Sequence, residues 1–426
     1  MNRLKNISII FLLSSFVFSF IISCDSTDPK PPEKPPGYQE DIPWPSLADS
    51  PWPIIHGDPQ STGRVAELGP QYGEIEFRIE FPSTEFSHKA FQSPIIGPDS
   101  TIYIIYNNFP DKIRCYLFAI SHLGFIKWKV PINADSTKRE VNVVTSSLLI
   151  DKNGIIHLFD WGGYYYGINI SGEIVWKKNI SKSVLGTFSI SKNGLVIAAT
   201  DQNSILCFDL YGNLEWEKKY TELDRNSSQA ITFSPDGNSF YAKGNDLSLL
   251  AFNLGGELKW KYNYGGQGAM YTAPVVDNLG NIYIYPSFPQ DSTKRGLFSL
   301  NSNGYIRFRV SALQGIAADY DHTIDTKGNI YVSEGYLNSV SYEGQLKWTS
   351  DEISGGSNLV SDLNNNVYLV SQTEERVKSI DENGILNWSI KIEGYTTQTP
   401  ALGNNGRIYF GAIKNGTDTF YFYSIR

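Results

Sequence analysis

The pentapeptide Gly212-Asn-Leu-Glu-Trp216 belongs to a Gly-x-x-x-Trp signature that recurs along the chain and decides its fold. Six further copies keep the same pattern, with phenylalanine in place of tryptophan once: Gly124-Phe-Ile-Lys-Trp128, Gly172-Glu-Ile-Val-Trp176, Gly256-Glu-Leu-Lys-Trp260, Gly304-Tyr-Ile-Arg-Phe308, Gly344-Gln-Leu-Lys-Trp348 and Gly384-Ile-Leu-Asn-Trp388. Neighbouring glycines lie 40 to 48 residues apart. This period is typical of propeller blades with four strands. The aromatic residues recur once per unit, so we expect them to pack between blades.

A second signature, a turn of the form Asp-x-x-Gly, falls between successive copies of the first. Clear examples are Asp151-Lys-Asn-Gly154, Asp277-Asn-Leu-Gly280 and Asp325-Thr-Lys-Gly328, and looser ones begin at Asp99, Ser191, Asp236, Asp362 and Gly403. Short apolar runs flank each turn, which is typical of a hairpin. Aspartates in loops can bind calcium, but these loops lack the dense acidic spacing of a calcium site, and turn chemistry accounts for them. Eight turns predict eight blades.

The two ends of the repeat region complement each other. The last unit reaches Arg426 without a fourth strand, and Gly73-Glu-Ile-Glu-Phe77 matches the strand that it lacks. Closing the last blade with this strand leaves no free sheet edge at the junction. The sequence therefore predicts an all-β, eight-bladed propeller of four-stranded antiparallel blades, with an N-terminal strand closing the last blade. We expect the closed ring to be monomeric.

Residues 1–23 have the composition of an export signal. Arg3 and Lys5 precede an apolar run that ends at Ser23-Cys24. Such a run, followed by a small residue and cysteine, resembles the signal of bacterial lipoproteins. We therefore expect Cys24 to be lipidated and to anchor the chain in a bacterial cell envelope, with the outer membrane favoured and the side left open. The alternatives are an uncleaved membrane anchor and plain secretion.

The chain after Cys24 divides into a tether and a propeller. Seven prolines between Pro29 and Pro45 favour extended chain, so residues 24–50 are interpreted as a tether. Residues 51–426 are assigned to the propeller, with residues 51–72 as an N-terminal clasp.

Charge and cysteine content exclude several classes of function. The net charge is −8, which argues against a nucleic-acid partner. Cys115 and Cys207 lie in different repeats, so we expect two free, buried and inert thiols and no disulfide. The five histidines form no metal-type pair, and no catalytic or phosphate-binding motif is present. We therefore assign no metal, no cofactor and no catalytic residue.

The segment Cys207-Phe-Asp209-Leu-Tyr-Gly212-Asn-Leu-Glu-Trp216 resembles the blade signature of pyrroloquinoline-quinone-like propellers. Residues Trp52 to Arg64 also resemble the N-terminal clasp of such propellers. The resemblance implies the fold, but the family includes quinoprotein dehydrogenases, assembly-factor lipoproteins and other proteins. Two departures argue against a dehydrogenase, because the chain has no adjacent cysteine pair and no matching cluster of calcium ligands. In fold and anchoring, the chain also resembles the lipid-anchored propeller of the outer-membrane β-barrel assembly machinery.

Two sets of residues are candidates for a site. Asp319, Asp321 and His322 lie where an innermost strand should begin, and they predict either an acid–base or ligand site at the channel mouth or side chains that only bind water there. Long, variable loops fall on the face opposite the tight turns, and they predict a partner face or a merely solvated surface. The charged residues of this face are Lys112, Lys138, Arg139, Arg225, Lys294 and Arg295.

These observations favour a membrane-anchored, non-catalytic propeller that binds or scaffolds an envelope protein. The alternatives are an enzyme on a propeller scaffold, either a hydrolase or lyase or, with less support, a quinone-dependent dehydrogenase.

Overall fold

Short apolar runs between glycine turns form the regular structure, which among the described residues is β-strand. The computed structural model describes residues 34–426 apart from 82–91, 108–114, 133–143, 145, 185, 224–228, 266–271, 287–294, 312, 314–321, 334, 352–356, 372, 397 and 418. Residues 35–426 form one unit, which is described here by itself. Within the described ranges, we find no helix that is long and apolar enough to span a bilayer.

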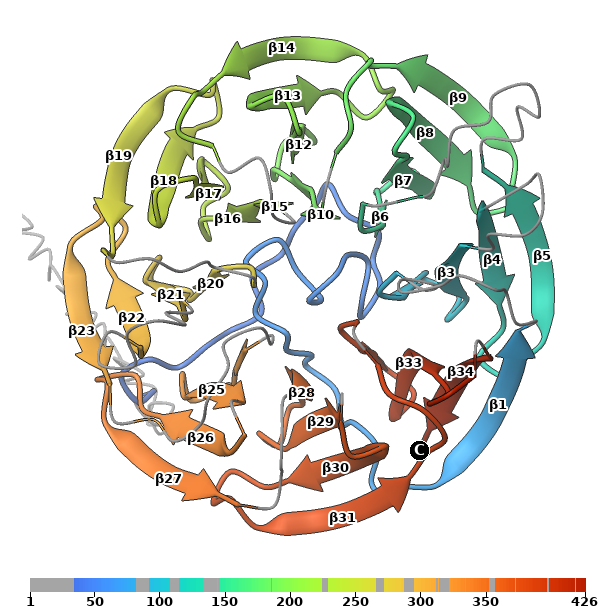
Figure 1. Ribbon diagram of the computed structural model, residues 1–426, viewed down its shortest axis with the longest axis vertical. Coiled ribbons are helices and arrows are strands. Elements are labelled where there is room, and N and C mark those ends of the chain that lie inside the picture. Colours follow the sequence, from blue (N-terminus) through green and yellow to red (C-terminus); the bar gives the residue numbers. More distant parts are fainter. Residues whose placement is uncertain are drawn as a thin grey trace, which may run out of the picture. The chain divides into compact units, whose positions relative to one another are not determined.

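Eight antiparallel sheets of four strands form the blades, numbered here 1 to 8 along the chain (Figure 1). Blades 1 and 2 comprise β2 (Ile95–Ile96), β3 (Ile102–Asn107), β4 (Cys115–Ile120) and β5 (Ile126–Pro131), then β6 (Leu149–Ile150), β7 (Ile155–Phe159), β8 (Tyr164–Asn169) and β9 (Ile174–Asn179). Blades 3 and 4 comprise β11 (Ser189–Ile190), β12 (Val196–Ala199), β13 (Ser204–Phe208) and β14 (Leu214–Lys219), then β16 (Thr232–Phe233), β17 (Ser239–Gly244), β18 (Ser248–Asn253) and β19 (Leu258–Asn263).

The second half of the ring repeats this order. Blades 5 and 6 comprise β20 (Val275–Val276), β21 (Ile282–Ile284), β22 (Leu297–Leu300) and β23 (Ile306–Val310), then β24 (Thr323–Ile324), β25 (Ile330–Ser333), β26 (Leu337–Val340) and β27 (Leu346–Ser350). Blades 7 and 8 comprise β28 (Ser357–Ser361), β29 (Val367–Ser371), β30 (Arg376–Ile380) and β31 (Leu386–Lys391), then β32 (Ala401–Gly403), β33 (Arg407–Ile413), β34 (Phe420–Ile425) and β1 (Ile75–Phe81). One parallel pair, β10 (Gly186–Thr187) with β15 (Gln229–Ala230), also forms.

The predicted closure of the ring is confirmed. Strand β1 pairs antiparallel with β34, from Phe81 opposite Phe420 to Ile75 opposite Ile425. The fourth strand of blade 8 is therefore the first of the described strands, and the fold is the predicted eight-bladed propeller.

The Gly-x-x-x-Trp signature joins each blade to the next. A Cβ atom added to Gly172 would lie 2.9 Å from the Trp128 ring of the preceding blade. The other contacts of this kind pair Trp176 with Gly212, Trp216 with Gly256, Trp260 with Gly304, Phe308 with Gly344, Trp348 with Gly384, Trp388 with Gly73 and Phe77 with Gly124. Eight contacts thus run around the whole ring. They confirm that the aromatic residues pack between blades, and they show that each glycine leaves room for the neighbouring ring.

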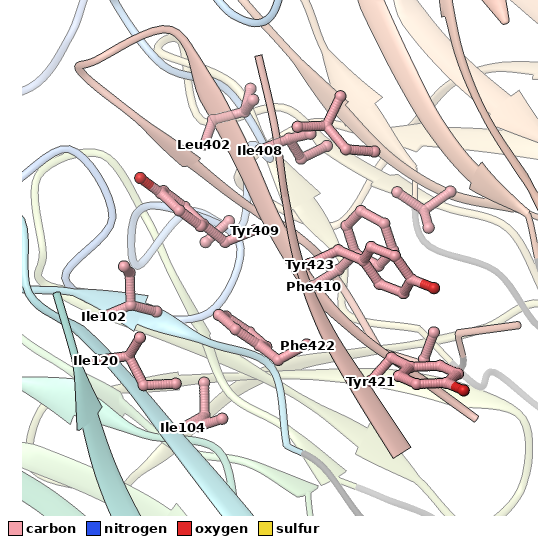
Figure 2. Close-up of a cluster of buried hydrophobic side chains, with 14 of the residues drawn as sticks. Ile102, Ile104, Ile120, Leu402, Ile408, Tyr409, Phe410, Tyr421, Phe422 and Tyr423 are labelled. Carbon is pink, nitrogen blue, oxygen red and sulfur yellow. The ribbon is translucent and has the colours of Figure 1, made fainter. Parts of the chain in front are cut away.

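The core lies between the blades, where the inner strands are apolar on both faces. Figure 2 shows the part shared by blades 8 and 1, in which Ile102, Ile104 and Ile120 belong to the same buried cluster as Tyr409 and Phe422. The outer strands instead alternate between exposed and half-buried residues, as β9 does. This pattern follows from burial of only one face of each outer strand.

Candidate functional site

An extended N-terminal segment, residues 44–67, lies against the inner strands of the ring (Figure 1). Its backbone carbonyls accept hydrogen bonds from the inner strands of six blades. The bonds run from Ile96 N–H to Trp52, Ile150 to Pro53, Phe233 to Pro59, Val276 to Gln60, Ile324 to Thr62 and Ser361 to Gly63, at N–O distances of 2.7 to 3.1 Å. In blade 3, the Trp44 indole N–H donates to the Ile190 carbonyl at 2.8 Å. One segment therefore connects seven of the eight blades.

The local sequence explains why this segment can follow the ring. Proline favours extended chain and keeps its carbonyl as an acceptor, as at Pro53 and Pro59. The chain changes direction at Gly57 and Gly63, which both have positive φ. Trp52 is fully buried. Residues 44–50, which the sequence analysis placed in the tether, make some of these contacts, because Lys152 N–H donates to the Ser46 carbonyl at 2.9 Å.

Asp58 closes a turn within this segment. Its carboxylate accepts hydrogen bonds from the backbone N–H and the hydroxyl of Thr62. Burial raises the pKa of Asp58, although the Thr62 bonds and the nearby Arg64 act in the opposite direction. Because its oxygens are occupied inside the turn, Asp58 is best explained as a structural carboxylate.

An acidic recess of about 540 Å³ lies along the segment. Its lining includes Glu40, Asp41, Asp49, Asp58, Arg64 and Glu67. The buried Arg64 donates to the Glu40 carbonyl and forms an ion pair of 2.9 Å with Asp41. Burial, together with repulsion from Asp41, raises the pKa of Glu67. The recess thus has more carboxylates than basic groups, and it favours cationic groups over anionic ones.

A second recess, here called the seam recess, lies beside the junction of blades 7 and 8 and has a volume of about 650 Å³. Leu68, Tyr72 and Leu363 line it and are 44%, 75% and 47% exposed, respectively. Arg407 and Arg426 also line it; Arg407 pairs with Glu76 of the strand that closes the ring, and Arg426 pairs with Glu74, just before that strand. The recess is therefore lined by exposed apolar side chains together with ion-paired arginines.

The backbone around the seam recess is held by several hydrogen bonds. The Gly69 N–H donates to the Asp362 carboxylate at 3.0 Å, and the Leu363 N–H donates to the Glu67 carbonyl at 3.0 Å. The Trp388 indole N–H donates to the Pro70 carbonyl at 3.2 Å. These bonds fix the chain on both sides of Leu68 before any ligand arrives.

The channel-mouth candidates are only partly described by the structure. His322 is buried at the start of β24, and its Nε2 lies 3.3 Å from the Tyr283 carbonyl oxygen. Asp319 and Asp321 lie outside the described residues. The predicted acid–base group at this mouth therefore stays a prediction.

Most of the predicted partner-face residues also lie outside the described residues. This applies to Lys112, Lys138, Arg139, Arg225 and Lys294, as it does to Cys24. Arg295 is half-buried, and its carbonyl accepts a hydrogen bond from Arg309 at 3.2 Å. Sequence reasoning missed the seam recess, because no pattern in residues 66–72 announces which side chains stay exposed.

The cysteines and acidic residues allow a test of the quinone group that the fold family implies. Cys115 in β4 and Cys207 in β13 are free and buried in different blades, and burial raises the pKa of each thiol to about 12. They therefore match the expectation of inert thiols and not an adjacent pair beside a cofactor. Among the described residues, no three His, Cys, Asp or Glu side chains converge in a way that could hold a metal ion. These residues do not fit a quinone–calcium site.

The comparisons with known proteins agree with this fold. A family model described as the outer membrane protein assembly factor BamB matches residues 124–287. The solved structure of BamB from Moraxella catarrhalis gives a TM-score of 0.58 and 15% identity, covering 82% of this chain and 97% of that one. No curated protein sequence matches the chain.

Two dehydrogenases are also similar in structure. Quinohemoprotein alcohol dehydrogenase from Comamonas testosteroni gives a TM-score of 0.64 and 14% identity, covering 89% of this chain and 81% of that one. A europium-containing methanol dehydrogenase gives a TM-score of 0.60 and 13% identity, covering 86% of this chain and 90% of that one. Over residues 124–287 the chain thus matches a family model of pyrroloquinoline-quinone-like repeats, as the blade signature predicts, and the solved structures share its propeller fold. At these identities, the structural likeness shows the fold alone.

Proposed function

We propose that this propeller is a non-catalytic, protein-binding scaffold of a bacterial cell envelope, held to the membrane through a lipidated Cys24. The seam recess is the observation that carries the protein-binding part. Two comparisons support this protein-binding role. The family model is described as the outer membrane protein assembly factor BamB, and the Moraxella structure is that of BamB. The anchor is supported by the composition of residues 1–24.

The seam recess has the properties of a protein-binding surface. Large apolar side chains that stay exposed beside one another mark interaction sites on soluble surfaces. Here they stand on a backbone that is already fixed, so binding costs little conformational entropy. Arg407 and Arg426, with their acidic partners, supply charged groups in the same recess. Protein interfaces commonly combine apolar contacts with polar groups in this way.

Capture of partners from native envelopes tests the seam recess. The double substitution Leu68→Ser with Tyr72→Ser should reduce recovery of the captured protein at least tenfold, because it removes the apolar wall. Tyr211→Ser is the matched control: Tyr211 is 69% exposed and, like Tyr72, directly precedes a signature glycine, but it lies in blade 3. Loss of capture in the control, or full capture by the double variant, would contradict this location.

The predicted partner face of variable loops is the second candidate surface, and the same assay separates the two. Charge reversal by Arg139→Glu with Arg295→Glu should weaken capture if the partner binds those loops. If only this variant loses capture, the scaffold function holds and the partner binds the loops. If neither pair of substitutions matters, no partner uses either surface and the proposal fails.

The anchor has its own experiment. In the full-length chain, Cys24→Ser should move the protein from the membrane pellet to the released fraction, because one acylated cysteine would supply the membrane affinity. Mass spectrometry of the mature wild-type N-terminus should show an acylated Cys24. An unmodified N-terminus, or a Cys24→Ser variant that stays in the pellet, would exclude the lipid anchor.

The dehydrogenase alternative is tested by adding pyrroloquinoline quinone with calcium to the purified protein. We expect no saturable binding, since the described thiols and carboxylates do not fit that group. Stoichiometric binding with dye reduction would overturn the non-catalytic part of the proposal.

A further inference from the structure

A cavity of about 340 Å³ lies between blades 2 and 3, away from the two recesses described above. Leu206, Phe208 and Leu214 of blade 3 form one wall, and Ile180, just after β9, faces them. Leu206 and Phe208 are buried in the interblade core, so the deep wall is rigid and apolar. Lys178 and Lys182 stand at its edge.

The next interface along the ring, between blades 3 and 4, has the same apolar wall. Leu250, Phe252 and Leu258 occupy the positions of Leu206, Phe208 and Leu214 relative to the signature glycine. The residue that faces this wall, however, is Tyr220 instead of Ile180, and both stand four positions after the signature tryptophan. The two interfaces therefore share an apolar wall but carry different residues opposite it, Ile180 in one and Tyr220 in the other.

Tyr220 shows how a phenol fits this wall. Its ring packs edge-to-face on Phe252, with ring centroids 4.9 Å apart and planes at 61°. Its hydroxyl donates a hydrogen bond to the carbonyl of Gly256, the signature glycine of that blade. Edge-to-face packing is a favoured geometry for aromatic pairs. In the cavity between blades 2 and 3, Phe208 and Gly212 occupy the two corresponding positions.

We propose that the cavity between blades 2 and 3 binds a 4-hydroxyphenyl group from outside the chain, in the place that Tyr220 fills one interface further on. The ring would pack on Phe208, and the hydroxyl would donate to the Gly212 carbonyl. This site is separate from the seam recess, and it does not rest on the scaffold function proposed above.

The edge of the cavity adds a preference for negative charge. At the filled interface, Lys218 forms an ion pair of 2.6 Å with Glu257. At the cavity, Lys178 occupies the position of Lys218, and its amine donates at 3.3 Å to Asn213, a neutral side chain at the position of Glu257. The neighbouring Lys182 pairs with Glu217 at 2.9 Å. The edge therefore retains one positive charge, which favours a phenol that carries a carboxylate.

Calorimetric titration of the full mature chain with 4-hydroxyphenylacetate tests the site. We expect one saturable site. Phenylacetate, which lacks the hydroxyl, should bind about fivefold more weakly, as expected for one lost hydrogen bond. The uncharged 4-hydroxyphenylethanol should also bind more weakly, and its affinity should not depend on salt. Equal binding of phenylacetate and 4-hydroxyphenylacetate would overturn the proposal.

Two substitutions exchange the residues that distinguish the two interfaces, and a third is a control. Ile180→Tyr should fill the cavity and abolish binding, while Ile180→Val should keep it and serves as the folding control. Tyr220→Ile should open the second interface and raise the stoichiometry from one site to two. Binding that survives Ile180→Tyr would exclude this location.

A peptide distinguishes the two possible sources of the hydroxyphenyl group, a tyrosine of another protein and a free small molecule. A tripeptide of tyrosine between two aspartates, blocked at both ends, should bind more tightly than the free acid if the natural ligand is a tyrosine in an acidic protein segment. Weaker binding of the peptide than of 4-hydroxyphenylacetate identifies a small molecule as the natural ligand. If neither probe binds, the site does not exist, while the seam-recess experiment is unaffected.

Discussion

The two outermost strands pair in the same way in blades 4 and 8. In blade 4 a turn joins these strands, whereas in blade 8 no turn joins them. In blade 4, the turn between β18 and β19 is closed by the Asn253 N–H donating to the Glu257 carbonyl at 3.0 Å. In blade 8, β34 and β1 come from opposite ends of the propeller, and Glu74 and Arg426 exchange two backbone hydrogen bonds of 2.9 and 3.1 Å instead. Side-chain pairs, Arg426 with Glu74 and Arg407 with Glu76, reinforce this junction.

This difference shows which interactions hold two strands together when no turn connects them. A turn keeps two strands together at almost no entropic cost, whereas two distant segments must overcome the entropy of closing a long loop. Blade 8 compensates with aromatic packing and ion pairs on β1, because the backbone bonds alone are those of any hairpin. The stability of the seam, meaning the pairing of β1 with β34, should therefore depend more on side chains than the stability of blades whose strands are joined by turns.

The largest expected effect comes from the buried end of β1. Phe81 packs on Tyr106 and Phe118 of blade 1, at ring centroid distances of 5.0 and 5.1 Å. Phe81→Ala should lower the free energy of unfolding by about 4 kcal/mol, as for other buried phenylalanines. It should also free β1, so that size-exclusion chromatography shows oligomers.

Tyr264, at the equivalent position after β19, is the control for this substitution. Its ring centroid lies 6.4 Å from that of Phe298, the counterpart of Phe118. Tyr264→Ala should destabilise the protein but leave it monomeric, because a turn still holds β19 to β18. Monomeric Phe81→Ala protein would show that the seam is no weaker than a joined blade.

An intermediate effect is expected at the seam glycine. A Cβ on Gly73 would lie 2.5 Å from the Trp388 ring, and the residue has φ of +65°. Gly73→Ala should cost about 3 kcal/mol by chemical denaturation, from the strained φ and the displaced ring together. Gly416 has φ of +72° and no atom within 4 Å of the added Cβ, so Gly416→Ala should cost only about 1 kcal/mol. Equal costs would mean that the Trp388 contact is unimportant.

The smallest effect concerns the ion pair between Glu76 and Arg407. The hydrogen bond from Arg407 holds the pKa of Glu76 below its usual value. Its stabilisation is therefore present above the ordinary pKa of glutamate, about 4.3, and is lost as the pH falls through the lower pKa of the folded state. Glu76→Gln should lower the free energy of unfolding by about 1 kcal/mol at pH 7. The difference should disappear at acid pH.

The control for the ion pair is Glu257→Gln in blade 4. Glu257 pairs with Lys218 but is largely exposed, and the strands there are joined by a turn. We expect no measurable change in stability at any pH. A Glu76→Gln effect that persists at acid pH would show that the lost charge is not its cause.

The ring and its closure were readable from the sequence because each blade interface needs a specific residue pair. Gly73-Glu-Ile-Glu-Phe77 carries the same signature as the other blades, which predicts its place as the missing strand, and in the structure Gly73 contacts Trp388 as the other signature glycines contact their aromatic partners. The path of residues 44–67 could not be read in the same way, since most of its bonds to the blades use backbone carbonyls, which every residue possesses.

The candidate sites were harder to predict than the fold. The exposure of Leu68 and Tyr72 depends on how the chain before β1 meets blades 7 and 8, which no local pattern encodes. The cavity beside Ile180 was accessible in principle, because alignment of the repeats places Ile180 opposite the position of Tyr220. Its meaning becomes clear only once Tyr220 is seen to bond the Gly256 carbonyl.

The pairing of β1 with β34 also sets the order in which the protein can mature. Strand β1 leaves the ribosome before every blade, yet Glu76 meets Arg407 only after a further 331 residues have been synthesised. Ring closure is therefore a late, post-translational event with a high contact order, and such events are slow. Until then β1 lacks its partner strand β34, and we expect the charged residues that alternate along it, Glu76, Arg78 and Glu80, to limit aggregation.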